Sequence, residues 1–179
     1  MAFVSVGGYV FAGEPQGISD PEPTLGDPIT VTEGLTIRPA EGWEVGEPLA
    51  FDLPNQGVTL NGVRLIGGIA KLDAVAAPGA PADPVDVWNI YVQDFLLQDA
   101  EQLRTSQELE PFTTDSGVQG VRGYYVGVFT GVASPIEGEI AAIVTPEGIG
   151  VIADGWAPEG QLGGSVDTIR SMVSTLGAG

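Results

Sequence analysis

Apolar residues recur at steps of three and four over residues 83–104, and this spacing predicts one long helix. Its apolar face consists of Val85, Trp88, Tyr91, Val92, Phe95, Leu96, Ala100 and Leu103. Asp83 suits the N-cap, Pro84 the first helical position, and Arg104 the last turn, where a cation is favoured. A helix with one broad apolar face is expected to lie on a sheet.

The rest of the chain consists of short apolar runs broken by Gly and Pro, which predicts β-strands. Before the long helix we expect two short strands that meet at Glu33-Gly34, and a third strand at residues 49–53. After the helix we expect strands at residues 109–113, 118–131, 139–144 and 149–156.

The clearest turn signal is Asn61-Gly62, which predicts a two-residue hairpin between strands at residues 58–60 and 63–72. Gly67-Gly68 lies inside the second of these strands and indicates a bulge or a bend there.

A second helix is expected at residues 165–176, with Ser165 as N-cap and Gly177 as its C-terminal stop. Strands in hairpin order with two amphipathic helices predict an α+β fold, in which an antiparallel β-sheet is flanked by the long helix and the C-terminal helix. We expect this globular domain to occupy residues 29–179.

The first 13 residues are apolar and uncharged, with Phe3, Val4, Gly7, Gly8, Tyr9 and Phe11 as the candidate contact residues. We interpret them as the outer end of a membrane anchor, because large apolar side chains need a partner surface and small residues let membrane helices approach closely. The alternative is a first β-strand. Residues 14–28 are rich in Pro and acids, which predicts an extended linker.

Composition excludes several classes of function. Among the 179 residues, 24 acids and six bases give a net charge of −18 at pH 7, so binding to nucleic acid is not expected. The absence of His and Cys excludes Cys/His zinc sites, cysteine nucleophiles and a histidine base. We therefore expect no enzyme, metal or cofactor. The alternative is a carboxylate-only cell-wall hydrolase that uses Glu137 and Glu139, two acids on one strand face that we expect to be solvated.

Glycines and aromatic residues alternate on one face of the strand at residues 118–131 and predict slots above the sheet. One interpretation is that Trp88 and Phe95 of the long helix fill the slots. The other is a pocket between helix and sheet for a lipid-like or other small apolar ligand. Its candidate residues are Trp88, Phe95, Gly123, Tyr125, Gly127 and Phe129.

Trp43 follows the turn at Glu41-Gly42 and has two interpretations. It either pins this turn to the domain body or is exposed as an anchor for a protein partner, a role in which Trp is enriched.

The stretch Leu35-Thr36-Ile37-Arg38-Pro39, followed by Glu41-Gly42-Trp43-Glu44-Val45, resembles the entry of PsbP-like domains. The later order of a long helix, antiparallel strands and a terminal helix is similar as well. This fold is shared by the PsbP extrinsic subunit of photosystem II, a Ran-binding nuclear import factor and actinobacterial LpqN-type lipoproteins, of which the LpqN type looks closest. The chain lacks the lipobox cysteine of a lipoprotein, so a peptide anchor is favoured over a lipid anchor.

The resemblance implies an α/β/α sandwich and an adaptor or accessory role without catalytic residues. Together with the apolar N-terminal segment, it suggests an acidic accessory subunit on the extracytoplasmic face of the cell membrane, either anchored or secreted. Its expected partner is a membrane protein complex or another protein, with lipid as a further candidate.

Overall fold

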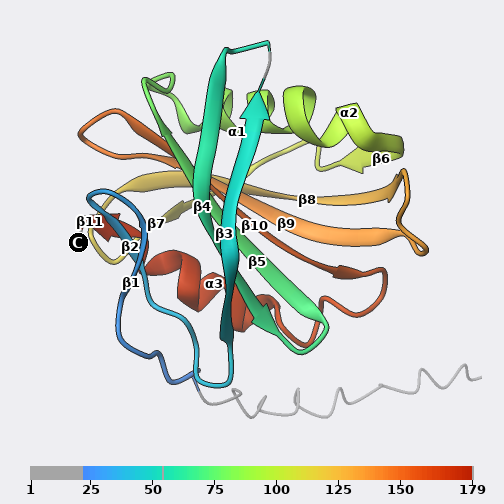
Figure 1. Cartoon of the computed structure of the whole chain (residues 1–179). Coiled ribbons are helices and arrows are strands. Elements are labelled where there is room, and N and C mark those ends of the chain that lie inside the picture. Colours follow the sequence, from blue (N-terminus) through green and yellow to red (C-terminus); the bar gives the residue numbers. More distant parts are fainter. Residues whose placement is uncertain (1–21, 54, 179) are drawn as a thin grey trace, which may run out of the picture.

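A computed structural model describes residues 22–53 and 55–178 of the chain. Its main sheet has eight antiparallel strands (Figure 1). Seven follow one another in the order β3 (Glu44–Leu53), β4 (Val58–Gly67), β5 (Ala70–Pro78), β10 (Ile149–Pro158), β9 (Ile136–Val144), β8 (Gln119–Phe129) and β6 (Ala100–Thr105), and β7 (Glu110–Thr113) also pairs with β8. Helices cover both faces, so the expected α+β sandwich is confirmed.

One face of the sheet carries the long helix, which is continuous over residues 84–99. It consists of α1 (Pro84–Tyr91), a π-helical segment η1 (Val92–Leu96) and α2 (Leu97–Asp99). The Asp83 side chain accepts a hydrogen bond from the backbone N–H of Val85 at 2.8 Å, which confirms the N-cap.

The prediction that this helix continues to Arg104 is wrong. Ala100 turns to extended backbone, and residues 100–105 form β6 along β8, with Ala100 opposite Phe129 and Leu103 opposite Gly127. The free edge of β8 needs hydrogen-bond partners, and this tertiary demand overrides a helical periodicity that ran on by chance.

The predicted hairpin at Asn61-Gly62 is also wrong. Both residues lie within β4, and the turn falls at Gly68, which has a φ of +63°. Gly62 instead serves close packing, because a Cβ built on it would lie 1.9 Å from the carbonyl oxygen of Ala74 on β5. The Gly67-Gly68 pair therefore marks the turn between β4 and β5 and not a bulge within one strand.

The opposite face is covered by α3 (Val166–Ser174) and a small sheet of β1 (Ile29–Thr32), β2 (Leu35–Ile37) and β11 (Gly177–Ala178). Ile169, Met172 and Val173 of α3 are buried. The helix ends at Ser174, and Gly177 pairs with Thr36 rather than ending the helix. The expected start of the helix after Ser165 is confirmed.

Residues 24–26 of the expected linker already contact the domain. Leu25 pairs with Ala40, and the Arg38 guanidinium donates hydrogen bonds to the carbonyls of Leu25 and Gly26. The boundary at residue 29 stays a prediction, and residues 1–21 lie outside the described part of the chain.

Candidate functional site

A row of charged side chains crosses the centre of the sheet on the face that carries α1. Arg64 of β4, Asp73 of β5 and Asp154 of β10 stand directly opposite one another on adjacent strands. Asp73 and Asp154 are only 4% and 3% exposed. Two acids in direct cross-strand register are unfavourable unless their charges are compensated.

The two carboxylates are held by different partners. Asp73 accepts two hydrogen bonds from the Arg64 guanidinium, at 2.6 and 2.7 Å, and one from the indole N–H of Trp156 at 3.3 Å. Asp154 accepts hydrogen bonds from the phenol groups of Tyr91, at 2.9 Å, and Tyr125, at 3.1 Å. The helix, through Tyr91, and four strands thus fix one connected polar cluster.

This arrangement changes the protonation of Asp154. Burial raises the pKa of its carboxyl to about 7, and the negative charge of Asp73 adds to the effect. Arg64 and the two phenol groups act in the opposite direction. Burial, with the neighbouring Asp154, also holds the pKa values of Tyr91 and Tyr125 well above their usual range. Near pH 7 the proton of Asp154 is therefore easily gained or lost.

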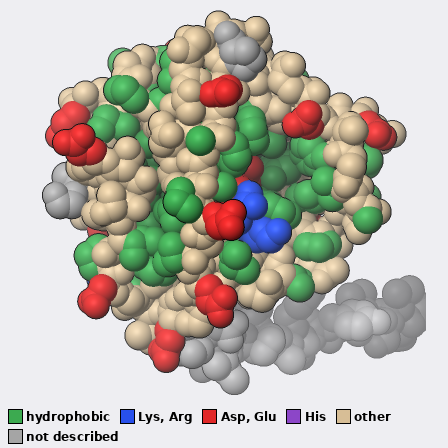
Figure 2. Space-filling view, viewed as in Figure 1, with side chains coloured by type: hydrophobic (Ala, Val, Ile, Leu, Met, Phe, Trp, Pro, Cys, Tyr) green, Lys and Arg blue, Asp and Glu red, His purple; other side chains and the backbone are tan. Residues whose placement is uncertain are grey.

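The cluster forms the floor of an open cleft of about 250 Å³ between the helix and the sheet. Figure 2 shows this side of the molecule hollowed beside a group of basic side chains and surrounded by apolar ones. Besides the floor, the lining residues are Phe51, Phe95, Leu96, Asp99, Phe129, Thr130, Val132 and Ile136. We call this space the helix–sheet cleft.

The π-helical segment contributes to the shape of the cleft. The Phe95 ring lies 5.0 Å from the Tyr91 ring and 4.7 Å from the Phe51 ring of β3, measured between centroids. A π-helical turn changes the direction of the side chains that follow it and is frequent at functional sites. The adjacent rings of Phe51, Phe95 and Tyr91 form one wall of the cleft.

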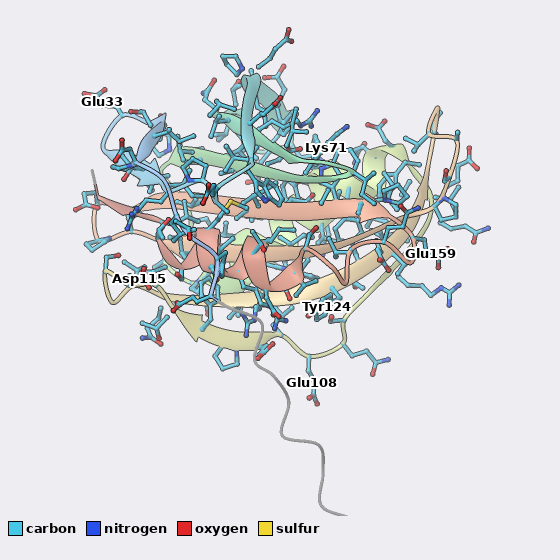
Figure 3. All side chains as sticks on the ribbon, turned by 90° about the horizontal axis from the view of Figure 1, so that it is seen from below. Glu33, Lys71, Glu108, Asp115, Tyr124 and Glu159 are labelled. Atoms are coloured by element: carbon cyan, nitrogen blue, oxygen red, sulfur yellow. The ribbon has the colours of Figure 1, made fainter. Side chains whose placement is uncertain are left out.

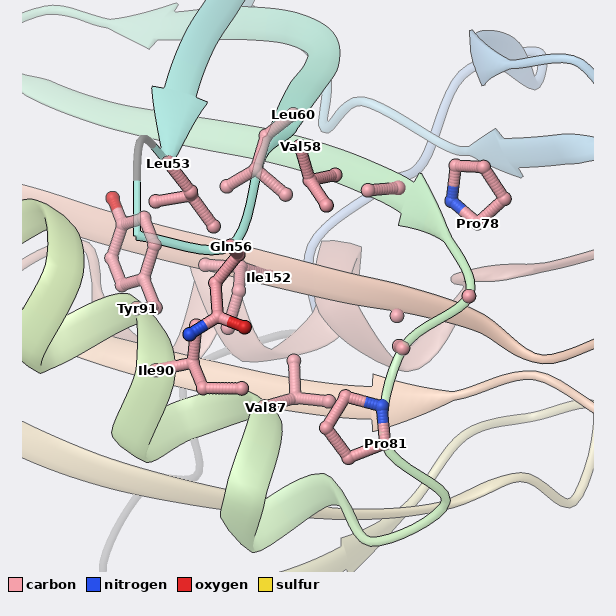
Figure 4. Close-up of a pocket in the computed structure, with 14 residues that line it drawn as sticks. Leu53, Gln56, Val58, Leu60, Pro78, Pro81, Val87, Ile90, Tyr91 and Ile152 are labelled. Atoms are coloured by element: carbon pink, nitrogen blue, oxygen red, sulfur yellow. The ribbon is translucent and has the colours of Figure 1, made fainter.

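A second, smaller cavity of about 80 Å³ lies on the far side of Tyr91, between α1 and the ends of β4, β5 and β10 (Figure 4). Its lining is almost entirely apolar and includes Leu53, Leu60, Val87, Ile90 and Ile152. With Gln56 as its one amide side chain, this cavity lacks the convergent polar groups that orient a ligand, so the helix–sheet cleft is the stronger candidate.

Three of the six residues expected in a pocket between helix and sheet do line the cleft, namely Phe95, Tyr125 and Phe129. The other three are taken up by packing. The slot at Gly123 holds the side chains of Leu109 and Trp88. The slot at Gly127 holds the Phe129 ring and the Leu103 side chain. Trp88 thus fills a slot as expected, whereas Phe95 turns to Phe51 and Tyr91.

Trp43 is half-buried on the α3 side of the sheet. Its ring covers Gly67, where an added Cβ would lie 2.3 Å from the indole. The indole thus packs against β4 and the core on the α3 side. The other candidate contact residues, Phe3, Val4, Gly7, Gly8, Tyr9 and Phe11, lie outside the described residues.

Glu137 and Glu139 are not a solvated pair, so this expectation is wrong. Glu139 is 5% exposed, and its carboxylate accepts hydrogen bonds from the guanidinium of Arg170 on α3, the shortest at 2.7 Å. Arg170 also donates to the Tyr124 hydroxyl, which lies beside α3 in Figure 3. Glu137 accepts a hydrogen bond from the backbone N–H of Leu162 at 2.7 Å. Both acids thus fix the structure on the α3 side.

Arg64, Asp73 and Asp154 were not predicted as site residues from the sequence. A signal was present, because each acid interrupts an otherwise apolar strand, as in Leu72-Asp73-Ala74-Val75 and Ile152-Ala153-Asp154-Gly155. An acid within a buried strand requires partners, and such partners mark a candidate site.

Within residues 22–53 and 55–178, no group of three or more acids is placed to hold a metal ion, and no helix is long and apolar enough to cross a membrane.

Two solved structures resemble this fold over most of both chains. Cyanobacterial PsbP (CyanoP) from Synechocystis sp. PCC 6803 matches with a TM-score of 0.57 and 13% identity, over 93% of this chain and 98% of that one. The domain has a PsbP-like fold. The Ran-binding protein Mog1p of Saccharomyces cerevisiae matches with a TM-score of 0.51 and 11% identity, over 87% and 96%. No protein-family model and no curated protein sequence matches the chain.

Proposed function

We propose that this PsbP-like domain is a non-catalytic accessory module that acts by binding, with the helix–sheet cleft as its recognition site. The observation that supports the proposal is the cleft itself, an open space of about 250 Å³ with aromatic walls and a hydrogen-bonded polar floor. Ligand sites have this composition, a largely apolar lining with a few fixed polar groups. This lining suits a small ligand bound between helix and sheet better than the purely apolar slots that the sequence predicts would.

The state of the floor favours binding over catalysis. A carboxylate hydrolase needs one acid as proton donor and a second carboxylate free to act as base or nucleophile. Both oxygens of Asp73 accept hydrogen bonds from Arg64, and both oxygens of Asp154 accept hydrogen bonds from tyrosines. A carboxylate with both oxygens engaged in this way has none free to attack a substrate or a water molecule, so the cluster suits recognition of charge.

The finer proposal is that the domain is anchored on the extracytoplasmic face of a membrane as a subunit of a larger assembly, in the manner of LpqN-type proteins. The apolar pattern of residues 1–13 and the acidic linker support it. We expect that deleting residues 2–12 releases the protein from membranes and from its protein partners during purification. Unchanged association of the truncated protein would contradict the anchor proposal and leave the cleft proposal intact.

The recognition site is tested by blocking the mouth of the cleft. Val132 lines the cleft and is 44% exposed, so Val132→Trp adds bulk there without disturbing the core. The matched control is Val45→Trp, at an exposed valine of β3 outside the cleft. Native mass spectrometry of the protein taken from its source should show a bound small molecule in the wild type and the control. Retention of that molecule by Val132→Trp would contradict the proposal.

A further inference from the structure

We propose that the helix–sheet cleft binds an organic ammonium ion, whose positive charge lies over the buried carboxylates and whose apolar groups contact the aromatic walls. This inference rests on the proposed function and specifies the chemical class of its ligand.

The charges of the cleft are the first argument. Among residues 22–53 and 55–178, four charged side chains line the cleft, namely the cation Arg64 and the acids Asp73, Asp99 and Asp154, and the Lys71 ammonium lies beside the lining residue Trp156. Arg64 is fully engaged by Asp73 through two short hydrogen bonds. Asp154 has only neutral phenol groups as hydrogen-bond partners. One cation supplied from outside would compensate the second buried carboxylate, whereas an anion would add to an existing excess of negative charge.

The walls are the second argument. Six aromatic residues line the cleft, namely Phe51, Tyr91, Phe95, Tyr125, Phe129 and Trp156. The faces of aromatic rings attract cations, and ring-lined sites are typical of ammonium recognition. The protein uses the same interaction itself, because the Lys71 ammonium lies 4.5 Å and the Arg64 guanidinium 5.6 Å from the centre of the Trp156 ring. Aromatic walls favour an organic cation over a hydrated metal ion, which prefers oxygen ligands.

Proton linkage is the third argument. A cation in the cleft favours the ionised form of Asp154, so binding should become stronger as pH rises towards the pKa of about 7. The groups that face Asp154 are Asp73 of β5, Arg64 of β4, Tyr91 of α1 and Tyr125 of β8. The phenol groups stay protonated in this range because their pKa values are raised. Asp154 is therefore the group whose titration controls the charge of the floor.

The inference is tested with three probes of one shape and different charge. Choline carries a trimethylammonium group, 3,3-dimethylbutan-1-ol is its neutral isostere, and 3,3-dimethylbutanoate is an anion of similar shape. Isothermal titration calorimetry should show choline binding at least about tenfold more tightly than the alcohol, as expected for a desolvated cation over aromatic rings. Its affinity should fall as pH drops below the pKa of Asp154, by up to about tenfold for each pH unit until the contribution of the charge is lost, and level off above that pKa.

Variants separate charge from packing. Asp154→Asn should remove the preference for choline over the alcohol and the pH dependence, whereas the control Asp86→Asn, at an exposed acid on α1, should keep both. Phe51→Leu removes one ring of the wall and should weaken choline binding several-fold. Phe112→Leu, on a strand of the α3 side outside the cleft, is its control. The wall variant keeps the test valid if Asp154→Asn fails to fold.

The outcomes distinguish this inference from the proposed function. Equal binding of choline and the alcohol, or tighter binding of the anion, would overturn the ammonium inference and still uphold the cleft as a binding site. Binding of none of the three probes would also overturn it, while the cleft would be judged by the Val132→Trp and Val45→Trp pair. Choline binding that persists unchanged in Asp154→Asn and Phe51→Leu would place the cation elsewhere and overturn the inference.

Discussion

The two faces of the sheet each bury acids, but they compensate them differently. On the α3 face, Glu139 has a guanidinium of its own, because Arg170 donates to both of its oxygens. On the α1 face, the Arg64 guanidinium is hydrogen-bonded to Asp73, whereas Asp154 accepts hydrogen bonds from two neutral phenol groups. The α3 face is closed over by a helix and a small sheet, whereas the α1 face leaves a cleft open to solvent.

The presence or absence of a cationic partner distinguishes buried acids that hold the structure together from buried acids that suit a binding role. A buried acid with its own partner fastens one element to another, as Arg170 fastens α3 to β9. A buried acid that lacks its own cation makes the isolated protein less stable, and a site retained at such a cost points to a role in binding.

The largest effect on stability is expected from truncating the tryptophan that packs α1 against the sheet, compared with truncating the tryptophan on the α3 side. Trp88 on α1 is 5% exposed and fills the slot over Gly123, so Trp88→Ala should lower the free energy of unfolding by about 3–5 kcal/mol. Trp43→Ala, at the half-buried tryptophan on the α3 side, should cost clearly less. Chemical denaturation of both variants measures this difference. Equal losses would show that α1 is not held to the sheet by Trp88.

The pH dependence of stability should carry the signature of Asp154. The folded-state pKa of about 7 lies above the unfolded value near 3.8, so its stabilising contribution is complete below about pH 4 and is lost as pH rises to about 7. The loss corresponds to about 4 kcal/mol, since each pKa unit is worth about 1.4 kcal/mol. Urea denaturation across this range should show the wild type falling relative to Asp154→Asn. Parallel curves would contradict the prediction.

The same acid-to-amide change should have the opposite effect on the α3 face. Glu139→Gln removes the buried partner of Arg170 and should destabilise the protein by about 2–3 kcal/mol near neutral pH. The pKa of Arg170 is raised chiefly by its hydrogen bonds to Glu139, which agrees with a stabilising pair. Thermal denaturation above pH 7 should thus show a lower Tm than the wild type for Glu139→Gln and a higher Tm for Asp154→Asn. A shift of both in one direction would refute the contrast between the faces.

The smallest effect concerns close packing under α3. A Cβ at Gly155 would lie 2.7 Å from the Cγ2 methyl of the buried Ile169, so Gly155→Ala should cost about 1–2 kcal/mol through overpacking. Gly164→Ala is the matched control, because a Cβ there meets no atom within 4 Å. Differential scanning calorimetry should show a lower Tm for the first variant only. Comparable losses in both would indicate a backbone effect unrelated to packing.

Much of the fold could be predicted from the sequence, because the amphipathic helices and alternating strands follow local periodicity. The N-cap at Asp83, both helices and the positions of most strands along the chain follow from it. The errors at residues 100–104 and at Asn61-Gly62 have another origin. In both places, pairing with a distant strand determined the backbone, and local patterns carry little information on such partners.

The candidate site was predictable only in part. Phe95, Tyr125 and Phe129 were identified because aromatic residues on facing elements mark the space between them. Arg64, Asp73 and Asp154 come together only through the register of three strands, which the sequence does not state. The acids inside apolar strands were the available hint, and they predict a polar cluster without saying which partner each acid has.

The most direct test of the uncompensated acid is the titration of Asp154 itself. Carbon-detected NMR of the aspartate carboxyl groups follows each side chain through its own pKa, and Asp154→Asn assigns the signal by its loss. We expect the Asp154 carboxyl to titrate at about 7 in the absence of ligand and at lower pH when choline is added. An Asp154 signal that titrates near 3.8, with or without choline, would contradict it.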